Sequence, residues 1–440
     1  MKKNDELQVY IEGYSSEGYG VAKPDGFVLF IPNTIKGETV IAHVTKVNKH
    51  FGYAFVKEVV TPSPCRKTPD CLAFKKCGGC ALWHIDYSEE MEFKRQKVMQ
   101  NLKKAGIDFN VPDILSPSAK IGYRNKAQYP VREQNGQVCV GFYRANSHTV
   151  IQSQCLIQPP VFDEIANAVK RFMIQKNISA YNEHTLSGTV RHIYLRRGDG
   201  IMLCLVVNGE LPYKTEFAQT LSVQFKEINT ICINYNSKNT NVILGDKYEN
   251  LLGDGCITDT LLGKRFKISP PAFYQVNHDG CECLYSVVKQ FAAVKKDERV
   301  LDLYCGIGTI GLCVADNARE LVGVEIVEAA VADAKANAKA NGIQNAHFYA
   351  DDAGNIAKVA TGNFDVIIVD PPRKGCDKKT LDFIIDKKPA RLVYVSCDSA
   401  TLARDLKILT EGGFKLMEVQ PVDMFPKTSH IETVVLLCKI

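Results

Sequence analysis

The segment that decides the fold of the C-terminal half is LDLYCGIGTIGL, residues 301–312. An apolar strand runs into Gly306 and Gly308 and then into a helix, and the spacing to Gly311 fits the pattern G-x-G-x-x-G. Glu325 follows 17 residues after Gly308. Small residues at such a turn let a ligand approach a helix N-terminus, and a following acid binds a ribose hydroxyl. The pattern predicts a site for a dinucleotide or for S-adenosylmethionine, and by itself it leaves both open.

Strands and helices alternate around this loop from about residue 270 onward. We expect strands at RVLDLYC, ELVGVEIV, AHFYADD, FDVIIVD and RLVYVSC, with helical stretches between them. This alternation predicts βαβ units and a twisted, mostly parallel sheet. We therefore assign residues 266–440 to an α/β, Rossmann-like domain.

The fourth of these strands ends in Asp370-Pro371-Pro372. Two prolines fix a rigid turn at the carboxyl edge of the sheet, where ligands of open α/β sheets bind. The turn is similar to the one with which many methyltransferases hold a planar base beside a methyl donor, and a plain proline stop is the alternative. Asp351, which ends the preceding strand, is a candidate contact to an adenine amino group or a helix cap.

The fifth strand, LVYVSC, brings Cys397 to the same edge. A thiol at a helix N-terminus favours the thiolate, although most cysteines that end a strand are merely buried. Methylation of uracil at carbon 5 needs such a nucleophile, because a thiolate that adds to carbon 6 makes carbon 5 reactive. A base must then remove the carbon-5 proton. Glu432, just before the last strand, is the candidate base, and a surface acid is the alternative.

The rest of the chain is predicted to be mostly β. Residues 1–61 contain five short strands separated by turn signals, which is typical of a small OB-like barrel. Residues 62–265 form a central, mostly-β domain that includes a helix over 88–105, capped by Ser88. We expect this helix to pack on the catalytic domain.

Composition and charge narrow the class of protein. The 440 residues are 45% hydrophobic and 23% charged, which excludes a disordered chain. No apolar run approaches 18 residues and no secretory signal precedes the first strand, so we expect a cytoplasmic protein without a membrane partner, and a monomer. The net charge of +5 is confined to residues 61–155, which carry +6. Such asymmetry favours an anionic partner such as RNA.

Three of the sixteen cysteines have the spacing C-x5-C-x2-C: Cys71, Cys77 and Cys80. In a cytosolic chain clustered cysteines indicate a metal site rather than disulfides. Thiolates so spaced can hold an iron–sulfur cluster or a tetrahedral zinc ion. A fourth ligand is needed, and Cys65 and Cys155 are the candidates. Zinc with Cys65 is the alternative that the spacing alone leaves open.

Four segments together resemble one family: LDLYCGIGTIGL, VDPPRKG, YVSCDSATLARDL and SHIETVVLL. They are similar to the RNA (uracil-5-)-methyltransferases, most of all to the bacterial enzymes that modify 23S ribosomal RNA and carry an iron–sulfur cluster. The resemblance covers nearly the whole chain and implies a multidomain protein. Its parts would be an N-terminal TRAM domain (an OB-like RNA-binding barrel), a central cluster domain and a Rossmann-like methyltransferase domain.

The resemblance also assigns roles to residues. It implies Cys397 as nucleophile, Glu432 as proton acceptor, S-adenosylmethionine as methyl donor, and a [4Fe-4S] cluster. The resemblance implies donor contacts at Gln275, Tyr304, Thr309, Glu325 and Asp370. Gly306 of the glycine loop and Asp351 of the strand end complete the set of predicted donor-binding residues. The implied cluster ligands are Cys71, Cys77, Cys80 and Cys155, which would leave Cys65 outside the site. Ser399 departs from the family, which usually has proline there.

Three other functions compete with methylation of ribosomal RNA. An NAD-dependent iron–sulfur oxidoreductase would use the glycine loop and the cysteines, but it gives no role to Asp370-Pro371-Pro372 or Cys397. A non-catalytic RNA-binding protein would leave the whole sheet edge unexplained. The same methyl transfer on tRNA is the third, and the residues do not separate it from ribosomal RNA.

Overall fold

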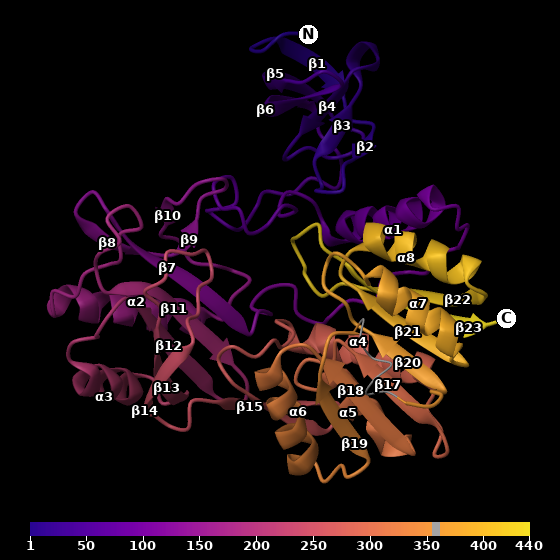
Figure 1. The fold of residues 1–440 in the computed structure, drawn as a ribbon. Coiled ribbons are helices and arrows are strands. Elements are labelled where there is room, and N and C mark those ends of the chain that lie inside the picture. Colours follow the sequence, from indigo (N-terminus) through magenta and orange to yellow (C-terminus); the bar gives the residue numbers. More distant parts are fainter. Residues whose placement is uncertain (354–360) are drawn as a thin grey trace.

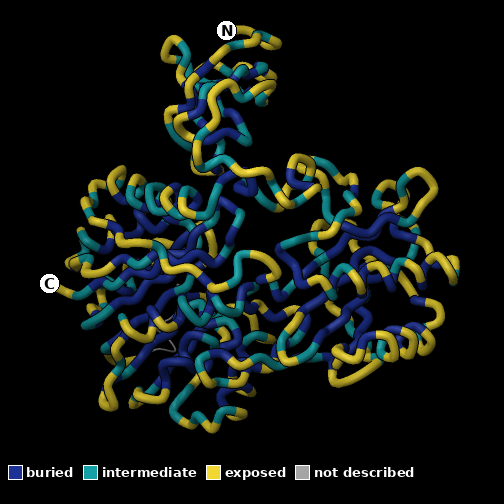
Figure 2. The backbone as a smooth tube through the Cα atoms, turned by 180° about the vertical axis from the view of Figure 1, so that it is seen from behind, coloured by how far each residue is buried: buried dark blue, intermediate teal, exposed yellow. Residues whose placement is uncertain are grey.

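The computed structural model describes residues 1–353 and 361–440. Three groups of elements are visible in Figure 1: an N-terminal sheet at the top, a second sheet with its helices on the left, and a third sheet covered by helices on the right. Seen from behind in Figure 2, the buried segments gather along the strands of the two larger groups.

The N-terminal sheet has six strands in the order β1-β5-β6-β4-β3-β2. The expectation of five strands is wrong because the first predicted strand is split. Ile11 donates its N–H to Glu38, whereas Glu12 donates its N–H to Val21, so the chain changes partners at this point. The strands are β1 Glu6–Tyr10, β2 Gly13–Tyr14, β3 Gly20–Ala22, β4 Val28–Ile31, β5 Thr39–Val47 and β6 Phe51–Thr61.

The second sheet also has six strands, in the order β14-β13-β12-β11-β7-β8. Its strands are β7 Lys126–Gln134, β8 Gln137–Val140, β11 Val190–Arg197, β12 Ile201–Val207, β13 Ile228–Tyr235 and β14 Lys247–Leu252. Smaller elements of this part are β9 Phe142–Tyr143, β10 Val150–Ile151, α2 Pro160–Gln175 and α3 Lys214–Gln224.

Strand β12, IMLCLVV, is buried along its whole length because both faces of the second sheet are covered. Leu203 and Leu205 pack with α2 and α3 on one face. Met202 and Cys204 face the other way and join the apolar cluster of the third sheet and its helices. A continuous apolar run is the expected sequence of a strand covered on both sides.

The third sheet has seven strands in the order β19-β18-β17-β20-β21-β23-β22. The pairs from β19 to β21 are parallel, as the alternating pattern predicted, and β23 runs antiparallel to β21 and β22. The strands are β17 Arg299–Leu303, β18 Glu320–Glu325, β19 Ala346–Ala350, β20 Val366–Val369, β21 Arg391–Ser396, β22 Phe414–Val422 and β23 Glu432–Lys439.

Strand order reverses beside β17, since the chain moves first to β18 and β19 and then to β20 on the other side. Such a switch point opens a crevice at the carboxyl ends of the strands. The helices of this part are α4 His278–Ala292, α5 Thr309–Val314, α6 Glu328–Ala340, α7 Lys378–Lys387 and α8 Ser399–Glu411. Short 3₁₀ turns lie at Pro24–Gly26 and Ala315–Asn317.

Helix α1, Tyr87–Lys104, packs against α8 of the third group although it precedes the second sheet in the chain (Figure 1). Its N-cap is Asp86, whose side chain accepts the N–H of Glu89, so Ser88 is not the cap. Fully buried Lys94 binds Glu90 of the same helix and Asp423 of the loop after β22, each at 2.8 Å. A lysine in this position needs partners from both segments to be buried at all.

The hairpin of β15 Ile257–Leu261 and β16 Lys264–Ile268 joins the second and third groups. Its apolar side chains belong to the same buried cluster as α4 and α5. The predicted domain boundary at 265/266 falls inside β16, whereas the boundary at 61 coincides with the end of β6. Within the described residues, no helix is both long and apolar enough to span a bilayer.

Candidate active site

One cavity of about 640 Å³ lies at the carboxyl edge of the third sheet. Five parallel strands end there, and β23 begins there because it runs in the opposite direction. All nine residues proposed from the sequence for catalysis and donor binding line this cavity: Gln275, Tyr304, Gly306, Thr309, Glu325, Asp351, Asp370, Cys397 and Glu432. The geometry therefore brings together segments that are spread over more than 150 residues of chain.

The glycine loop is shaped by its backbone. Gly308 has φ +82°, and a Cβ there would approach Leu312 and Phe348 to 3.2 Å, so only glycine fits. The Gly306 N–H donates to Glu325 at 3.2 Å, and the Val327 N–H donates to the other oxygen of the same carboxylate at 2.9 Å. Glu325 is thus held at the rim of the cavity, as a contact to a ribose would require.

Neighbouring contacts hold the Thr309 side chain and the main chain of Gln275 and Asp351, three residues predicted to bind the donor. The Thr309 hydroxyl lies 3.0 Å from the Tyr285 hydroxyl, at the start of α5. Gln275 is only 7% exposed, and its main-chain carbonyl accepts the side-chain N–H of Asn125 at 3.0 Å. Asp351 donates its N–H to the Glu325 carbonyl at 3.1 Å, which places the end of β19 beside that of β18.

Cys397 follows β21 and lines the cavity, but its thiol is not activated in this conformation. Burial raises its pKa to about 12, the negative charges of Glu432 and Asp370 add to the effect, and Arg373 opposes it. Asp398 caps α8 by accepting the N–H groups of Ala400 and Thr401. The expectation that the helix N-terminus favours the thiolate is therefore wrong for this state, because burial and the two neighbouring acids raise the thiol pKa.

Glu432 is the first residue of β23 and is only 4% exposed, so the alternative of a surface acid is excluded. Burial raises its pKa to about 8, with a further contribution from Asp370 and an opposing one from Arg373. Burial likewise raises the pKa of Asp370 to about 7. Acids with pKa values raised toward neutrality in a cavity are typical of groups that exchange protons at physiological pH.

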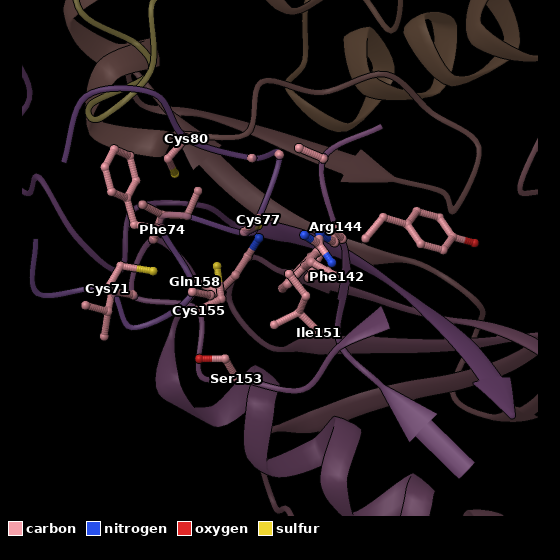
Figure 3. Close-up of a pocket in the computed structure, with 18 of the residues that line it drawn as sticks. Cys71, Phe74, Cys77, Cys80, Phe142, Arg144, Ile151, Ser153, Cys155 and Gln158 are labelled. Carbon is pink, nitrogen blue, oxygen red and sulfur yellow. The ribbon is translucent and has the colours of Figure 1, made fainter. Parts of the chain in front are cut away.

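A second cavity, of about 680 Å³, lies beside the second sheet and is lined by Cys71, Cys77, Cys80 and Cys155. Figure 3 shows the sulfur atoms of Cys71, Cys80 and Cys155 turned into a common space, although Cys155 comes from a distant segment. Cys65 does not line it. The structure therefore groups the four cysteines that the family resemblance implied and leaves the fifth outside.

The thiols of this cavity influence one another. Burial raises the pKa of Cys80 to about 11, and the nearby Cys77 and Cys71 raise it further. Burial raises the pKa of Cys155 to about 12, and Cys80 contributes. In the part of the chain that is described, no group of three or more His, Cys, Asp or Glu side chains is arranged as a metal site.

Comparison with known proteins decides the family. A model of the tRNA (uracil-5-)-methyltransferases matches residues 86–440, and a model of the TRAM domain matches residues 2–57. The chain belongs to the tRNA (uracil-5-)-methyltransferase family. The match identifies it as an RNA (uracil-5-)-methyltransferase with an N-terminal TRAM domain, which confirms the resemblance seen in the sequence. It gives no support to the oxidoreductase or to a non-catalytic RNA-binding protein.

Known relatives match the methyltransferase over nearly its whole length. It is 42% identical to an uncharacterized RNA methyltransferase of Clostridium acetobutylicum, over 100% of this chain and 98% of that one. It is 43% identical to one of Listeria innocua, over 99% and 98%. The tRNA (uracil-54, C5)-methyltransferase of Pyrococcus abyssi, solved with S-adenosyl-L-homocysteine, is 27% identical with a TM-score of 0.79 and covers 98% of this chain and 99% of its own.

Sequence reasoning missed several residues of the methyltransferase cavity. Phe273, Arg373 and Phe425 line it, and so does His430, which lies 3.5 Å from the Arg373 guanidinium. Asp302, under the glycine loop, is fully buried and accepts the Gly311 N–H at 2.9 Å. Burial raises its pKa to about 8. The signal that could have found Asp302 was a lone acid inside the apolar strand LDL.

Ser399, where the resemblance implied proline, makes a contact that proline could not make. Its hydroxyl is buried and accepts the side-chain N–H of Asn101 at 2.8 Å. Asn101 belongs to α1, so the substitution adds a hydrogen bond between α1 and the first turn of α8. Cys397 lies two residues before this contact.

Proposed function

We propose that this enzyme transfers a methyl group from S-adenosylmethionine to carbon 5 of a uridine in 23S ribosomal RNA. Cys397 acts as the nucleophile and Glu432 as the base that takes the carbon-5 proton. The observation that carries the proposal is that both side chains, from β21 and β23, open into one cavity with the glycine loop and Asp370.

The chemistry fits the two residues. The Cys397 thiol gives up its proton to solvent and its sulfur bonds to carbon 6 of uracil, so the electron pair of the double bond between carbons 5 and 6 is delocalised over carbon 5 and the carbon-4 carbonyl. That pair would bond carbon 5 to the methyl group, while the donor sulfur would keep the electrons of its broken bond to the methyl carbon. Glu432 then removes the carbon-5 proton. The electron pair of that C–H bond restores the double bond between carbons 5 and 6 as the carbon–sulfur bond breaks. A carboxylate with its pKa raised to about 8 is a stronger base than an exposed one.

Residues of the glycine loop and the strand ends are suited to hold the donor. Glu325 would accept hydrogen bonds from the ribose, Thr309 and Gln275 lie on the side of α4 and α5, and Asp351 would face the adenine. S-adenosylmethionine, when bound, supplies the methyl group from its sulfonium. The methyltransferase of Pyrococcus abyssi, whose solved structure holds S-adenosyl-L-homocysteine, supports this assignment.

The choice of RNA is testable with the intact enzyme. The assignment of ribosomal RNA as the substrate rests on the resemblance of the motifs. The similarity to a tRNA (uracil-54, C5)-methyltransferase favours tRNA instead. With radiolabelled donor, we expect label in 23S transcripts as 5-methyluridine, and none with Cys397→Ala. Label in tRNA alone would overturn the ribosomal assignment. No label in either RNA, from protein that binds the donor, would overturn the mechanism.

We propose further that the four cysteines hold a [4Fe-4S] cluster. Their thiols line one cavity of sufficient volume, and they come from two segments that the cluster would tie together. Bound cations would lower the thiol pKa values, which burial now raises. Phe74, Trp83, Tyr123 and Ile157 provide an apolar surrounding that limits access of water.

A further inference from the structure

The outer face of the N-terminal sheet carries a row of rings to which the proposed mechanism gives no role. We call it the aromatic strip, and it consists of Phe30, His43, Phe51, Tyr53 and Phe55. The rings come from three neighbouring strands, because β6 pairs with β4 on one side and with β5 on the other. The strip therefore crosses the sheet rather than following one strand.

Strand geometry places these rings outside the core. Successive residues of a strand point to opposite faces, and along β6 Gly52 and Ala54 are buried while Phe51, Tyr53 and Phe55 are not. The core of this sheet is formed by small and aliphatic residues of the other face, such as Leu29 and Val40. Phe55 remains 50% exposed, so folding of the sheet does not account for the rings.

The rings support one another as a platform. Phe30, Phe51 and Tyr53 contact each other with ring centroids 5.7 to 5.8 Å apart. His43 lies against Phe55 at 4.9 Å, with the ring planes 32° apart. Phe51 lies edge-on to Phe30 and Tyr53, with the planes 65° and 85° apart, so a flat ligand would stack on single rings or on the His43–Phe55 pair rather than on one continuous plane. Unpaired bases have such flat faces and stack on aromatic side chains whatever their sequence.

Charges around the strip suit a phosphate backbone. Lys46 pairs with Tyr53 in the β5–β6 ladder, and Lys49 lies in the turn between these strands. Both are exposed, and neither forms an ion pair within the residues that the structure describes. A phosphate could therefore bind these two lysines without displacing an acid, whereas His43 of the strip lies 3.6 Å from Glu6, which also binds Lys57.

The strip is connected to the catalytic cavity. Phe30 also lines a cavity of about 570 Å³ between the N-terminal sheet and α1, together with Lys36, Lys97 and Lys104. Lys97 donates to the Ser429 carbonyl at 2.9 Å, next to His430 at the wall of the catalytic cavity. A strand that leaves the active site could reach the rings through this cavity, whose three lysines face three glutamates, Glu12, Glu89 and Glu92.

We propose that the aromatic strip stacks unpaired bases of the RNA that flank the target uridine. The proposal rests on the proposed function for its substrate class, single-stranded RNA, and it assigns a surface and a mode of contact to the N-terminal sheet. Stacking contributes to affinity and holds the strand in register, while the chemistry stays with Cys397. The affinity due to the rings is independent of salt, unlike that due to lysines.

The test is direct RNA binding by the full-length enzyme. The probe is a fluorescein-labelled single-stranded oligouridylate, titrated at several salt concentrations against the wild type and Phe51→Leu/Phe55→Leu. At about 1–3 kcal/mol per stacked base, losing one stack weakens binding about 5- to 150-fold. The salt slope should stay the same for the ring variant. For Lys46→Gln/Lys49→Gln it should flatten by about 0.7 per lost phosphate contact.

Tyr10→Leu is the matched control, because Tyr10 lies on the same face with 58% exposure but outside the strip. A circular-dichroism spectrum checks that each variant is folded. Unchanged oligouridylate affinity of a folded ring variant would overturn the proposal, and so would an equal loss for Tyr10→Leu. Failure of methyl transfer alone would leave this binding measurement intact, so the two proposals fail separately.

Discussion

Replacing Glu432 with glutamine changes catalysis and stability in opposite directions. The carboxyl group is buried, and burial raises its pKa from the ordinary 4.5 to about 8. An amide has the same shape but cannot take a proton, so addition to uracil and methylation proceed while release of the product stops. We expect a protein–RNA adduct that survives denaturation on gels. Turnover at the wild-type rate without an adduct would remove Glu432 from the role of base.

The stability effect follows from proton binding. An unfolded chain loses the Glu432 proton near pH 4.5, whereas the folded site keeps it up to about pH 8. Stability due to this group is therefore full below pH 4.5 and is lost as the pH rises through 8. At about 1.4 kcal/mol per pKa unit the ceiling is roughly 5 kcal/mol, and relaxation of the site reduces the expected loss to about 1–3 kcal/mol. Glutamine has no such loss.

Hydrogen exchange of the β23 amides at pH 5 and pH 8 measures the difference. Relative to the wild type, Glu432→Gln should be more protected at pH 8 than at pH 5, after correction for intrinsic exchange. Glu418→Gln, on the exposed side of β22, is the control and should show no such pH dependence. If the gain for Glu432→Gln is equal at the two pH values, the carboxyl group does not carry a raised pKa.

Three further predictions concern other parts of the molecule. Cys397→Ala should abolish methylation with donor affinity nearly unchanged in calorimetry, and methylation near the wild-type level would exclude this sulfur from the mechanism. Anaerobically purified protein should be brown with four irons per chain, as the family resemblance implies. The Cys155→Ala variant should lose iron, and the Cys65→Ala variant should keep it. Stoichiometric zinc without iron would contradict the cluster. Lys94→Met should lower the free energy of unfolding in urea by about 3–5 kcal/mol, because buried Asp423 loses its cation and buried Glu90 keeps only Lys427. Exposed Lys103→Met should change it little, and equal effects would show that the buried ion network contributes nothing.

Short-range patterns predicted most of the catalytic edge. Gly306 and Gly308 predict a turn with positive φ angles, which few residues other than glycine adopt. Asp370 precedes two prolines, which also predict a turn. Alternation of strands and helices then places their segments at one edge. Glu432 has no such signal, since its position before the last strand suggested a base but equally a surface acid. Its burial depends on the antiparallel direction of β23, which periodicity does not reveal.

The burial of charged residues whose partners are distant in the chain could not be predicted from the sequence. Lys94 lies in a helix rich in charge, where a solvated side chain is the reasonable expectation. It is nevertheless fully buried, because Asp423, more than 300 residues away, meets it. The error over the Cys397 thiolate has the same origin. Burial and two neighbouring acids set the pKa, and neither can be read from the residues next to the cysteine.

The catalytic cavity is completed by residues that lie before the methyltransferase sheet in the chain. Asn125 holds the Gln275 carbonyl, and Lys97 holds the Ser429 carbonyl beside the wall of the cavity. Both bonds fix loops that the third sheet does not otherwise constrain, and ordering such loops costs about 1–2 kcal/mol per residue. A fragment that begins at residue 266 would lack both donors and would have to meet that cost alone. The segments that precede the methyltransferase sheet therefore help to build the active site.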